Sequence, residues 1–382
     1  MQAITPFQES VDIIREAGGE KLDLCYQCGL CTGSCPWNQL RSFLVRKLVH
    51  QAQLGVVDFA TEDLWLCTTC RTCVQRCPRG VEIIDIMRAM RRVVAETGAA
   101  KVPDSLRLSA KNIAGTGNPL GQAPEQRADW VGDLNVKTFT DGTELLYYSC
   151  CIPAYDPKIK RVAQATAKVL KMAGADFGIL GSRESCCGES IRKSGSEQLF
   201  QNLAQRNIEA FSGAGVRQIV VSSPHCYHSL KNEQPYLPAG FEVSHIVQYL
   251  ANLISDGRLK FTKEVKKKIA YHDSCYLGRH NGVYDEPRKI LESIPGVEVV
   301  EMSDNRENAL CCGGGGGRIW METKKGERFS DLRIQQALDV GAEVLAVSCP
   351  YCMLNFEDSL LTTDKSNALE IKDVVELVQA AL

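Results

Sequence analysis

The chain has 382 residues, more than one ordinary hydrophobic core accommodates, so about two or three domains are expected. Its 44 Lys and Arg residues nearly balance its 46 Asp and Glu residues, and without a basic block this charge argues against a nucleic-acid partner. No apolar run approaches the ~20 residues of a membrane span, and the first residues lack the charged and apolar regions of a secretory signal. We therefore expect a cytoplasmic protein without a membrane span, which partners could hold at the inner face of a membrane.

The unusual feature of the composition is its 18 cysteines. Disulfides are the first alternative, but several cysteines are adjacent, which is too close for an unstrained bridge between Cα atoms about 4.4–6.8 Å apart. A chain of this length also buries a core without covalent staples, and nothing directs it to an oxidising compartment. The spacing therefore favours thiolates that bind metals or clusters over disulfides.

Residues 1–97 contain two cysteine runs of the same form, C-x2-C-x2-C-x3-C-P. This is the spacing that bacterial ferredoxins use for 4Fe–4S cubane clusters, in which the fourth cysteine of one run binds the other cluster. A zinc site would more often show two CxxC pairs without a third cysteine. We therefore expect two cubanes, the first held by Cys25, Cys28, Cys31 and Cys77 and the second by Cys67, Cys70, Cys73 and Cys35.

Each run is followed by apolar residues at helical spacing, which predicts an α-helical ferredoxin-like module. The helix expected within residues 37–55 has an inward face of Leu40, Phe43, Leu44 and Leu48. The helix expected within residues 81–98 has an inward face of Ile84, Met87, Met90 and Val93. Its arginines are expected on a solvated outer face, although they could instead dock an acidic partner: Arg88, Arg91 and Arg92.

Residues 98–143 are rich in Gly, Pro, Ala and polar residues and are expected to form a connector. Beyond it the chain repeats itself, with a first unit at 144–262 and a second unit at 263–382. Each unit reads strand, cysteine, helix, strand, cysteine pair, helix, strand, cysteine, helix. This alternation predicts two pseudo-symmetric α/β units, whose cysteines lie at the carboxyl ends of parallel strands.

The second unit has the more complete set of cysteines, in which Cys275 precedes the pair Cys311-Cys312 and then Cys349-x-x-Cys352. This spacing resembles the cysteine-rich CCG domain of heterodisulfide reductases at every position. The resemblance implies that these five thiolates hold a noncubane 4Fe–4S cluster, the reactive centre of that family. The glycines at 313–317 would let backbone N–H groups approach the cluster sulfurs without Cβ clashes, and they lack the lysine and serine of a phosphate-binding loop.

The first unit departs from this pattern, because Ser223 stands where the second unit has Cys349. A serine oxygen is harder and less acidic than a thiolate and is therefore a poorer ligand for a sulfur-rich cluster. We expect the two units to hold different centres. The first is expected to bind an iron–sulfur cluster or zinc through the remaining cysteines: Cys151, Cys186, Cys187 and Cys226.

One further cysteine, Cys150, has no counterpart in the second unit, where Ser274 stands. The first site could hold a cubane, a noncubane cluster with Ser223 or Cys150 as substitute ligand, a zinc ion, or nothing. Cys150 reaches the same centre as Cys151 only if the strand end bends, because successive side chains of a strand normally point to opposite faces.

Over the whole chain, the order of two cubane motifs and two CCG units resembles the iron–sulfur subunit of membrane-linked heterodisulfide reductases, equivalent to a fusion of the C and B subunits of the soluble enzyme. The resemblance implies an oxidoreductase subunit of a larger complex, which receives electrons from a flavoprotein or a membrane haem- or quinone-linked subunit. The electrons would pass through the cubanes to the noncubane cluster, which reduces or oxidises a disulfide- or thiol-type substrate. The alternative is a purely electron-transferring subunit, for example of an acyl-CoA or benzoyl-CoA reductase or a membrane respiratory complex.

A few polar residues close to the cysteines in sequence could protonate a leaving thiolate or bind an anionic substrate, or could be structural. The sequence leaves both roles open for His225, His228, His272, His280 and Arg318.

Overall fold

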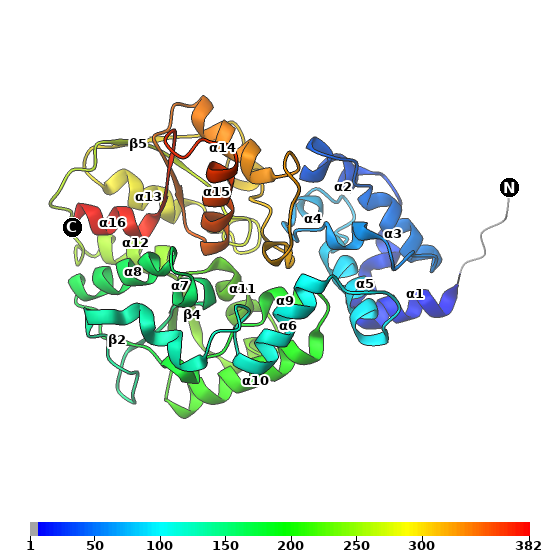
Figure 1. The fold of residues 1–382 in the computed structure, drawn as a ribbon, viewed down its shortest axis with the longest axis horizontal. Helices are drawn as coiled ribbons and strands as arrows, with labels where there is room; N and C mark the ends of the chain where they lie inside the picture. The colour runs from blue at the N-terminus through cyan, green and yellow to red at the C-terminus, as the bar shows by residue number, and fades with distance from the viewer. Residues whose placement is uncertain (1–6) are drawn as a thin grey trace.

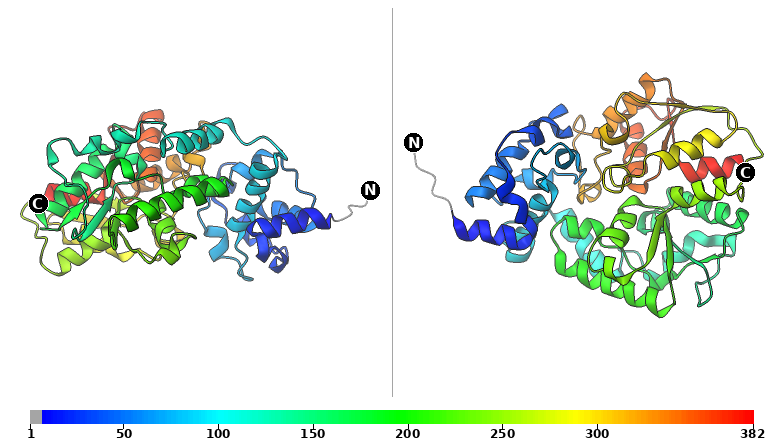
Figure 2. Two further views of the ribbon diagram at one scale, coloured as in Figure 1. Left: turned by 90° about the horizontal axis from the view of Figure 1, so that it is seen from below. Right: turned by 180° about the vertical axis from the view of Figure 1, so that it is seen from behind.

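The computed structural model describes residues 7–382, so residues 1–6 of the first predicted domain lie outside the described part of the chain. Figure 1 shows a helical N-terminal part at one end of the molecule and two α/β units at the other. The two further views in Figure 2 show the same separation. Within residues 7–382, no helix is both long and apolar enough to cross a membrane.

Residues 7–97 form helices and turns, as the sequence predicts. The helices are α1 (Gln8–Ile14), α2 (Leu30–Gly33), α3 (Val45–Leu54), α4 (Thr72–Gln75) and α5 (Ile83–Thr97), with turns of π or 3-10 helix at Arg15–Gly19, Glu20–Leu24, Pro36–Gln39 and Glu62–Trp65. The inward face predicted for α5 is confirmed, since all four of its apolar residues are buried.

Helix α3 is shorter than the sequence predicts. It begins at Val45, and Leu44 is 45% exposed rather than buried. The side chain of Asn38 accepts a hydrogen bond from the backbone N–H of Phe43 and donates one to its carbonyl, both at 3.0 Å. These bonds hold residues 38–43 in a turn, because a short amide side chain competes with the helical pattern of the backbone.

The outward position expected for Arg91 is wrong. The side chain is fully buried and donates hydrogen bonds to four carbonyl oxygens, those of Leu64 (2.7 Å), Cys67 (2.8 Å), Lys193 (3.0 Å) and Gly316 (3.0 Å). A guanidinium has five N–H donors, so it can be buried when backbone carbonyls surround it. Arg91 thereby joins the helical part to both α/β units.

The segment 98–143 contains helix α6 (Asp104–Thr116) and a 3-10 segment at Pro124–Leu134. The 3-10 segment packs against α8 of the first α/β unit, and Trp130 and Arg127 are buried there. A segment that contributes buried side chains to its neighbour is part of the fold and not only a tether.

The first α/β unit has a four-stranded parallel sheet in the order β2-β1-β3-β4. Its strands are β1 (Leu145–Tyr148), β2 (Phe177–Gly178), β3 (Gln218–Val221) and β4 (Glu242–His245). Its helices are α7 (Cys151–Tyr155), α8 (Lys160–Met172), α9 (Glu189–Lys193), α10 (Glu197–Gly213), α11 (Pro224–Asn232) and α12 (Ile246–Ser255).

The second unit has a parallel sheet in the corresponding order, β6-β5-β7-β8. Its strands are β5 (Lys267–Tyr271), β6 (Val297–Val300), β7 (Val344–Val347) and β8 (Glu370–Asp373). Its helices are α13 (Asp285–Ser293), α14 (Phe329–Asp339), α15 (Pro350–Thr362) and α16 (Val374–Ala381). The two units share one hydrophobic core, in which α8 packs on α16 and α12 packs on α13.

The sheets place the cysteines as predicted, because each parallel strand runs toward the same edge of its sheet. Cys151 follows β1 and Cys226 follows β3, while Cys275 follows β5 and Cys349 follows β7. The pairs Cys186-Cys187 and Cys311-Cys312 lie in the segments that follow β2 and β6, so the cysteines of both units come after the carboxyl ends of strands.

Candidate iron-sulfur centres

The first cavity in the helical part is enclosed and is lined by Cys25, Cys28, Cys31 and Cys77. Three of these cysteines come from the first run and the fourth from the second run, which is the grouping expected for the first cubane. The backbone N–H of Val81 donates to the sulfur of Cys77 at 3.4 Å. Backbone N–H donors of this kind stabilise thiolates and the sulfurs of a bound cluster.

A second enclosed cavity is lined by the other four cysteines of the two runs, Cys35, Cys67, Cys70 and Cys73. The N–H of Thr69 donates to the sulfur of Cys67 at 3.4 Å. Burial raises the pKa of Cys35, so in the absence of a metal its thiol keeps its proton. Ile83 at the start of α5 lines both cavities, so its side chain lies between them.

In the second CCG unit all five cysteines are buried. The sulfurs of Cys312 and Cys352 are 3.2 Å apart. Hydrogen bonds from Cys311 and Cys352 lower the pKa of Cys312 well below its ordinary value. The N–H of Gly313 donates to the sulfur of Cys311 at 3.3 Å, which is the approach of backbone to sulfur expected from the glycine run.

His272 lies close to two cysteines of this set. One of its ring nitrogens lies within 4.8 Å of the sulfurs of Cys312 and Cys352. Arg333 donates to Nδ1 of His272 at 3.2 Å, and because a guanidinium only donates, Nδ1 is the acceptor and Nε2 carries the proton. That Nε2–H is buried and has no hydrogen-bond partner among the described residues. It is therefore a free donor beside the thiols.

The second cavity of the helical part and the second CCG unit are in direct contact. The thiols of Cys70 and Cys311 lie side by side, and the sulfur of Cys311 is also 3.8 Å from the hydroxyl of Thr68. Arg279 is buried at this junction and donates to the carbonyls of Cys70 and Ala309, each at 2.7 Å. The positive charge of Arg279 would offset the negative charge of thiolates on both sides.

In the first CCG unit, one enclosed cavity is lined by the four cysteines that the sequence selects and by Cys150 and Ser223. The N–H of Gly188 donates to the sulfur of Cys186 at 3.4 Å, as Gly313 does in the second unit. Hydrogen bonds from Cys186 and Cys226 lower the pKa of Cys187 to about 6. This thiol therefore gives up its proton readily, as a metal ligand must.

Arg127 is a residue of this site that the sequence reasoning missed. It is buried, donates to Glu184 at 3.0 Å and points an N–H at the sulfur of Cys151 at 3.6 Å. It comes from the segment expected to be a connector, whose composition gave no signal of a role in a site.

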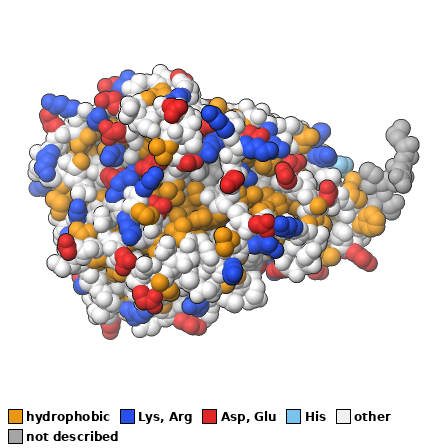
Figure 3. Space-filling model, viewed as in Figure 1, with side chains coloured by type: hydrophobic (Ala, Val, Ile, Leu, Met, Phe, Trp, Pro, Cys, Tyr) orange, Lys and Arg blue, Asp and Glu red, His pale blue; other side chains and the backbone are white. Residues whose placement is uncertain are grey.

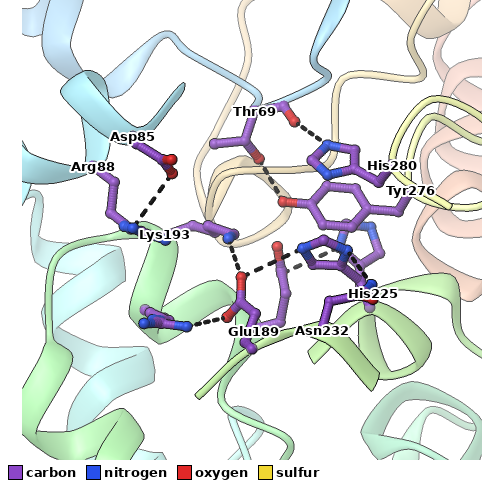
Figure 4. A network of polar contacts seen from close by, with 12 residues as sticks. Thr69, Asp85, Arg88, Glu189, Lys193, His225, Asn232, Tyr276 and His280 are labelled. Carbon is purple, nitrogen blue, oxygen red and sulfur yellow. Dashed lines mark hydrogen bonds and ion pairs between the residues drawn. The ribbon is translucent and has the colours of Figure 1, made fainter. Parts of the chain in front are cut away.

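A buried polar network connects both CCG units to the loop that contains Thr69 (Figure 4). The ring of Tyr276 stacks between those of His280 and His225, at centroid distances of 4.1 and 4.0 Å. The hydroxyl groups of Tyr276 and Thr69 are hydrogen-bonded at 2.8 Å, and Nδ1 of His225 lies 3.1 Å from the Glu189 carboxylate.

His225 also contacts Cys349 of the second unit. Burial by itself would lower the pKa of His225, but the negative charges of Glu189 and Cys349 outweigh it and raise the pKa to about 10. His228, by contrast, has a pKa lowered by burial. His225 is therefore the cationic histidine of this network and links the first site to the second.

A cavity of about 520 Å³ reaches Cys312 from the surface. Its walls come from the helical part, the segment 98–143 and both α/β units, through Trp37, Leu120, Ile152 and Leu354 among others. Figure 3 shows hydrophobic side chains gathered at the centre of this face of the molecule, where these parts meet. The second CCG site is thus accessible to a small molecule.

Arg318 lines this cavity and is 8% exposed. It donates to the hydroxyl of Thr323 at 2.8 Å and lies over the ring of Trp37 at 5.4 Å. Among residues 7–382 it forms no ion pair with a carboxylate. Burial lowers its pKa to about 10, so the side chain remains cationic at neutral pH.

These observations fit iron–sulfur clusters. Enclosed cavities are each lined by at least four thiols, backbone N–H groups point at several of the sulfurs, and buried arginines lie beside them. Fe–S clusters are held by cysteine thiolates and are tuned by hydrogen bonds to sulfur and by burial.

Comparison with known families agrees with this chemistry. The cysteine-rich domain family CCG matches residues 145–231 and 269–357, and a 4Fe-4S dicluster domain matches residues 21–81. One subunit of the dihydromethanophenazine:CoB–CoM heterodisulfide reductase of Methanosarcina barkeri is 31% identical, over 95% of this chain and 94% of its own length. The chain belongs to the family of this heterodisulfide reductase subunit and related iron–sulfur oxidoreductases.

Two longer relatives are more similar in sequence. The EtfAB:quinone oxidoreductase of Syntrophomonas wolfei is 37% identical over 84% of this chain, and the probable iron-sulfur-binding oxidoreductase FadF of Bacillus subtilis is 38% identical over 83%. The chain spans 47% and 46% of the lengths of these two proteins. The chain thus has the CCG and 4Fe-4S dicluster domains of this family, as the sequence predicts.

Proposed function

We propose that the chain binds two 4Fe–4S cubanes, a noncubane 4Fe–4S cluster and a fourth metal centre. The cubanes are held by Cys25, Cys28, Cys31 and Cys77 and by Cys67, Cys70, Cys73 and Cys35. Cys275, Cys311, Cys312, Cys349 and Cys352 hold the noncubane cluster, and Cys151, Cys186, Cys187 and Cys226 hold the fourth centre. The lining of the three enclosed cavities and the contacts among the second-unit thiols support this division.

We infer the domain boundaries from the same elements: a cluster module at 1–97, a connecting segment at 98–143, a first CCG unit at 144–262 and a second at 263–382. The corresponding strand orders of the two sheets support a pseudo-twofold relation between the units. Because His225 contacts Cys349, the two sets of cysteines lie close together.

When bound, the clusters supply one-electron storage and carry electrons from the cubanes to the second CCG site. The chain's own residues set the order of the centres. Ile83 separates the first two cavities, Cys70 and Cys311 join the second cavity to the second CCG unit, and His225 joins that unit to the first. The protein thereby keeps neighbouring sets of cysteines in contact with one another.

The observation that favours catalysis at this site is the cavity that opens onto Cys312. An electron carrier needs no such access, whereas a substrate with a disulfide or thiol group needs a path to the reactive centre. Arg318, which has no carboxylate partner among residues 7–382, would bind an anionic group of the substrate and orient it toward Cys312. We propose that the substrate is an anionic disulfide or the corresponding thiols.

The test is reduction of small anionic disulfides by the anaerobically purified chain, with reduced viologen as the electron source. Leu354→Trp would fill part of the cavity while leaving every cysteine in place. Leu361→Trp on the same helix, at a position 56% exposed, is the matched control. We expect disulfide reduction in the wild type and in Leu361→Trp, and its loss in Leu354→Trp. Equal rates in both variants, or no reduction in the wild type, would contradict catalysis at this site.

A relay without its own substrate is the second candidate, and the longer relatives named above favour it. The name of one of them describes electron transfer between EtfAB and a quinone. In this case a flavoprotein would reduce the chain and a quinone- or haem-linked subunit would oxidise it, at the cytoplasmic face of a membrane. Reduction of the clusters by an electron-transfer flavoprotein, with no activity toward disulfides, would favour this candidate.

A further inference from the structure

The backbone of Cys150 is unusual. Its φ of 69° and ψ of 164° lie in a region that only glycine adopts without strain. Cys150 is also 2% exposed, so its side chain is held inside the protein. A strained conformation at a buried, chemically reactive residue calls for a physical reason.

The start of helix α7 does not supply that reason. The carbonyl of Cys150 accepts a hydrogen bond from the N–H of Ala154 at 3.2 Å, which begins the helix. In the second unit the carbonyl of Ser274 accepts the equivalent bond from Gly278 at 2.8 Å, and Ser274 has no positive φ. The same turn therefore forms without strain where no cysteine precedes the first ligand.

The direction of the side chain supplies the reason. Because the chain bends at Cys150, both Cys150 and Cys151 line the enclosed cavity of the first CCG unit, although successive side chains of a strand normally diverge. The thiol of Cys150 also contacts that of Cys226, one of the four cysteines of the site. The bend thus brings a fifth thiol to the first site.

A fifth thiol is what this site otherwise lacks. Ser223 precedes Pro224 at the N-terminus of α11, as Cys349 precedes Pro350 at the N-terminus of α15. Ser223 lines the same cavity as Cys150 but offers a hydroxyl, a poor ligand for an iron–sulfur cluster. The two units therefore carry the same number of thiols, with one of them at a different position.

We propose that Cys150 is the fifth thiolate ligand of the first CCG unit and that this unit holds an iron–sulfur cluster with five thiolate ligands rather than a four-thiolate zinc ion. Cys150 acts in this way only if the first unit holds a metal centre, so the assignment rests on the proposed function. This assignment changes the expectation from the sequence. Both centres would then have five thiolate ligands, and they would differ only in the position of one of these cysteines.

The test compares the iron content and electron paramagnetic resonance spectra of full-length variants purified anaerobically. Cys150→Gly removes the thiol and relieves the backbone, because glycine adopts a positive φ freely. We expect it to lose about 4 iron atoms per chain, one four-iron cluster, with the spectrum of that cluster. The double variant Cys150→Gly, Ser223→Cys places the fifth thiol as in the second unit and is expected to regain this iron.

The control is Ser274→Gly, which also introduces glycine at the equivalent position of the second unit but removes no thiol, and it is expected to keep its iron. An iron content and spectrum unchanged in Cys150→Gly would overturn the assignment. The iron content of the wild type tests the proposed function separately. Fewer than about 8 iron atoms per chain would mean that one of the two cubanes is absent, and this result does not depend on the role of Cys150.

Discussion

A Cβ atom added at Gly316 would lie closer than 3.0 Å to the carbonyl oxygen of Cys67. Gly315 has the same relation to the carbonyl oxygen of Thr68. The glycine run of the second CCG unit therefore packs backbone to backbone against the loop that contains Cys67 and Thr68. Side chains larger than hydrogen at these positions would push apart the contacting cysteines Cys70 and Cys311.

We expect Gly316→Ala to destabilise the protein and to slow electron transfer to the second CCG site. Gly326→Ala is the matched control, because Gly326 also has a positive φ but has no atom within 4 Å of an added Cβ. Both variants share the backbone strain, and overpacking should cost Gly316→Ala about 1–3 kcal/mol more. Thermal midpoints of the anaerobic holoproteins measure the difference, and equal midpoints would show that the close packing is not needed.

Replacing Arg91 should destabilise the whole molecule. Arg91→Met leaves four buried carbonyl groups without donors, and each unsatisfied buried group costs about 1–3 kcal/mol. Arg92→Met is the control on the same helix, since Arg92 is partly exposed and pairs with Glu96 at 2.8 Å, a pair worth about 0.3–0.5 kcal/mol. A loss of stability in Arg91→Met no larger than in the control would contradict a joining role for Arg91.

The fourth cysteine of each run is predicted to serve the other run's cluster. We expect Cys35→Ser to remove the same resonance signal as Cys70→Ser, and Cys77→Ser to remove the same signal as Cys25→Ser, with each variant losing about 4 iron atoms. Spectra of the dithionite-reduced variants measure this. If Cys35→Ser instead removed the signal lost in Cys25→Ser, each run would hold its own cluster.

His272 is predicted to donate a hydrogen bond to a sulfur of the second CCG centre. His272→Leu should weaken the cluster's binding by about 10–100-fold, as losses of groups that orient metal ligands do. It should also make the cluster harder to reduce, because hydrogen bonds to sulfur raise the reduction potential. Iron release to a chelator and a potentiometric titration measure the two effects. The exposed His50 supplies the control variant His50→Leu. If both variants released iron at the same rate and had the same reduction potential, His272 would not act on the cluster.

The sequence predicted the parts of the fold that depend on spacing along the chain. The alternation of apolar runs predicted both parallel sheets, and it placed the cysteines after the ends of the strands. Arg91 was misjudged because helical periodicity separates polar from apolar residues but does not show that carbonyls from three parts of the chain surround one arginine. Arg127 lies in a segment without a periodic apolar pattern. The bend at Cys150 depends on a positive φ, which cannot be predicted from the residue type.

The most direct test is an iron anomalous-scattering map of anaerobically grown crystals of the full chain. We predict iron in both cavities of the helical part and a noncubane cluster in contact with Cys275, Cys349, Cys352 and the pair Cys311-Cys312. Three results would contradict a reactive centre in the second CCG unit: zinc at that site, no metal there, or a cubane bound by only four of those five cysteines.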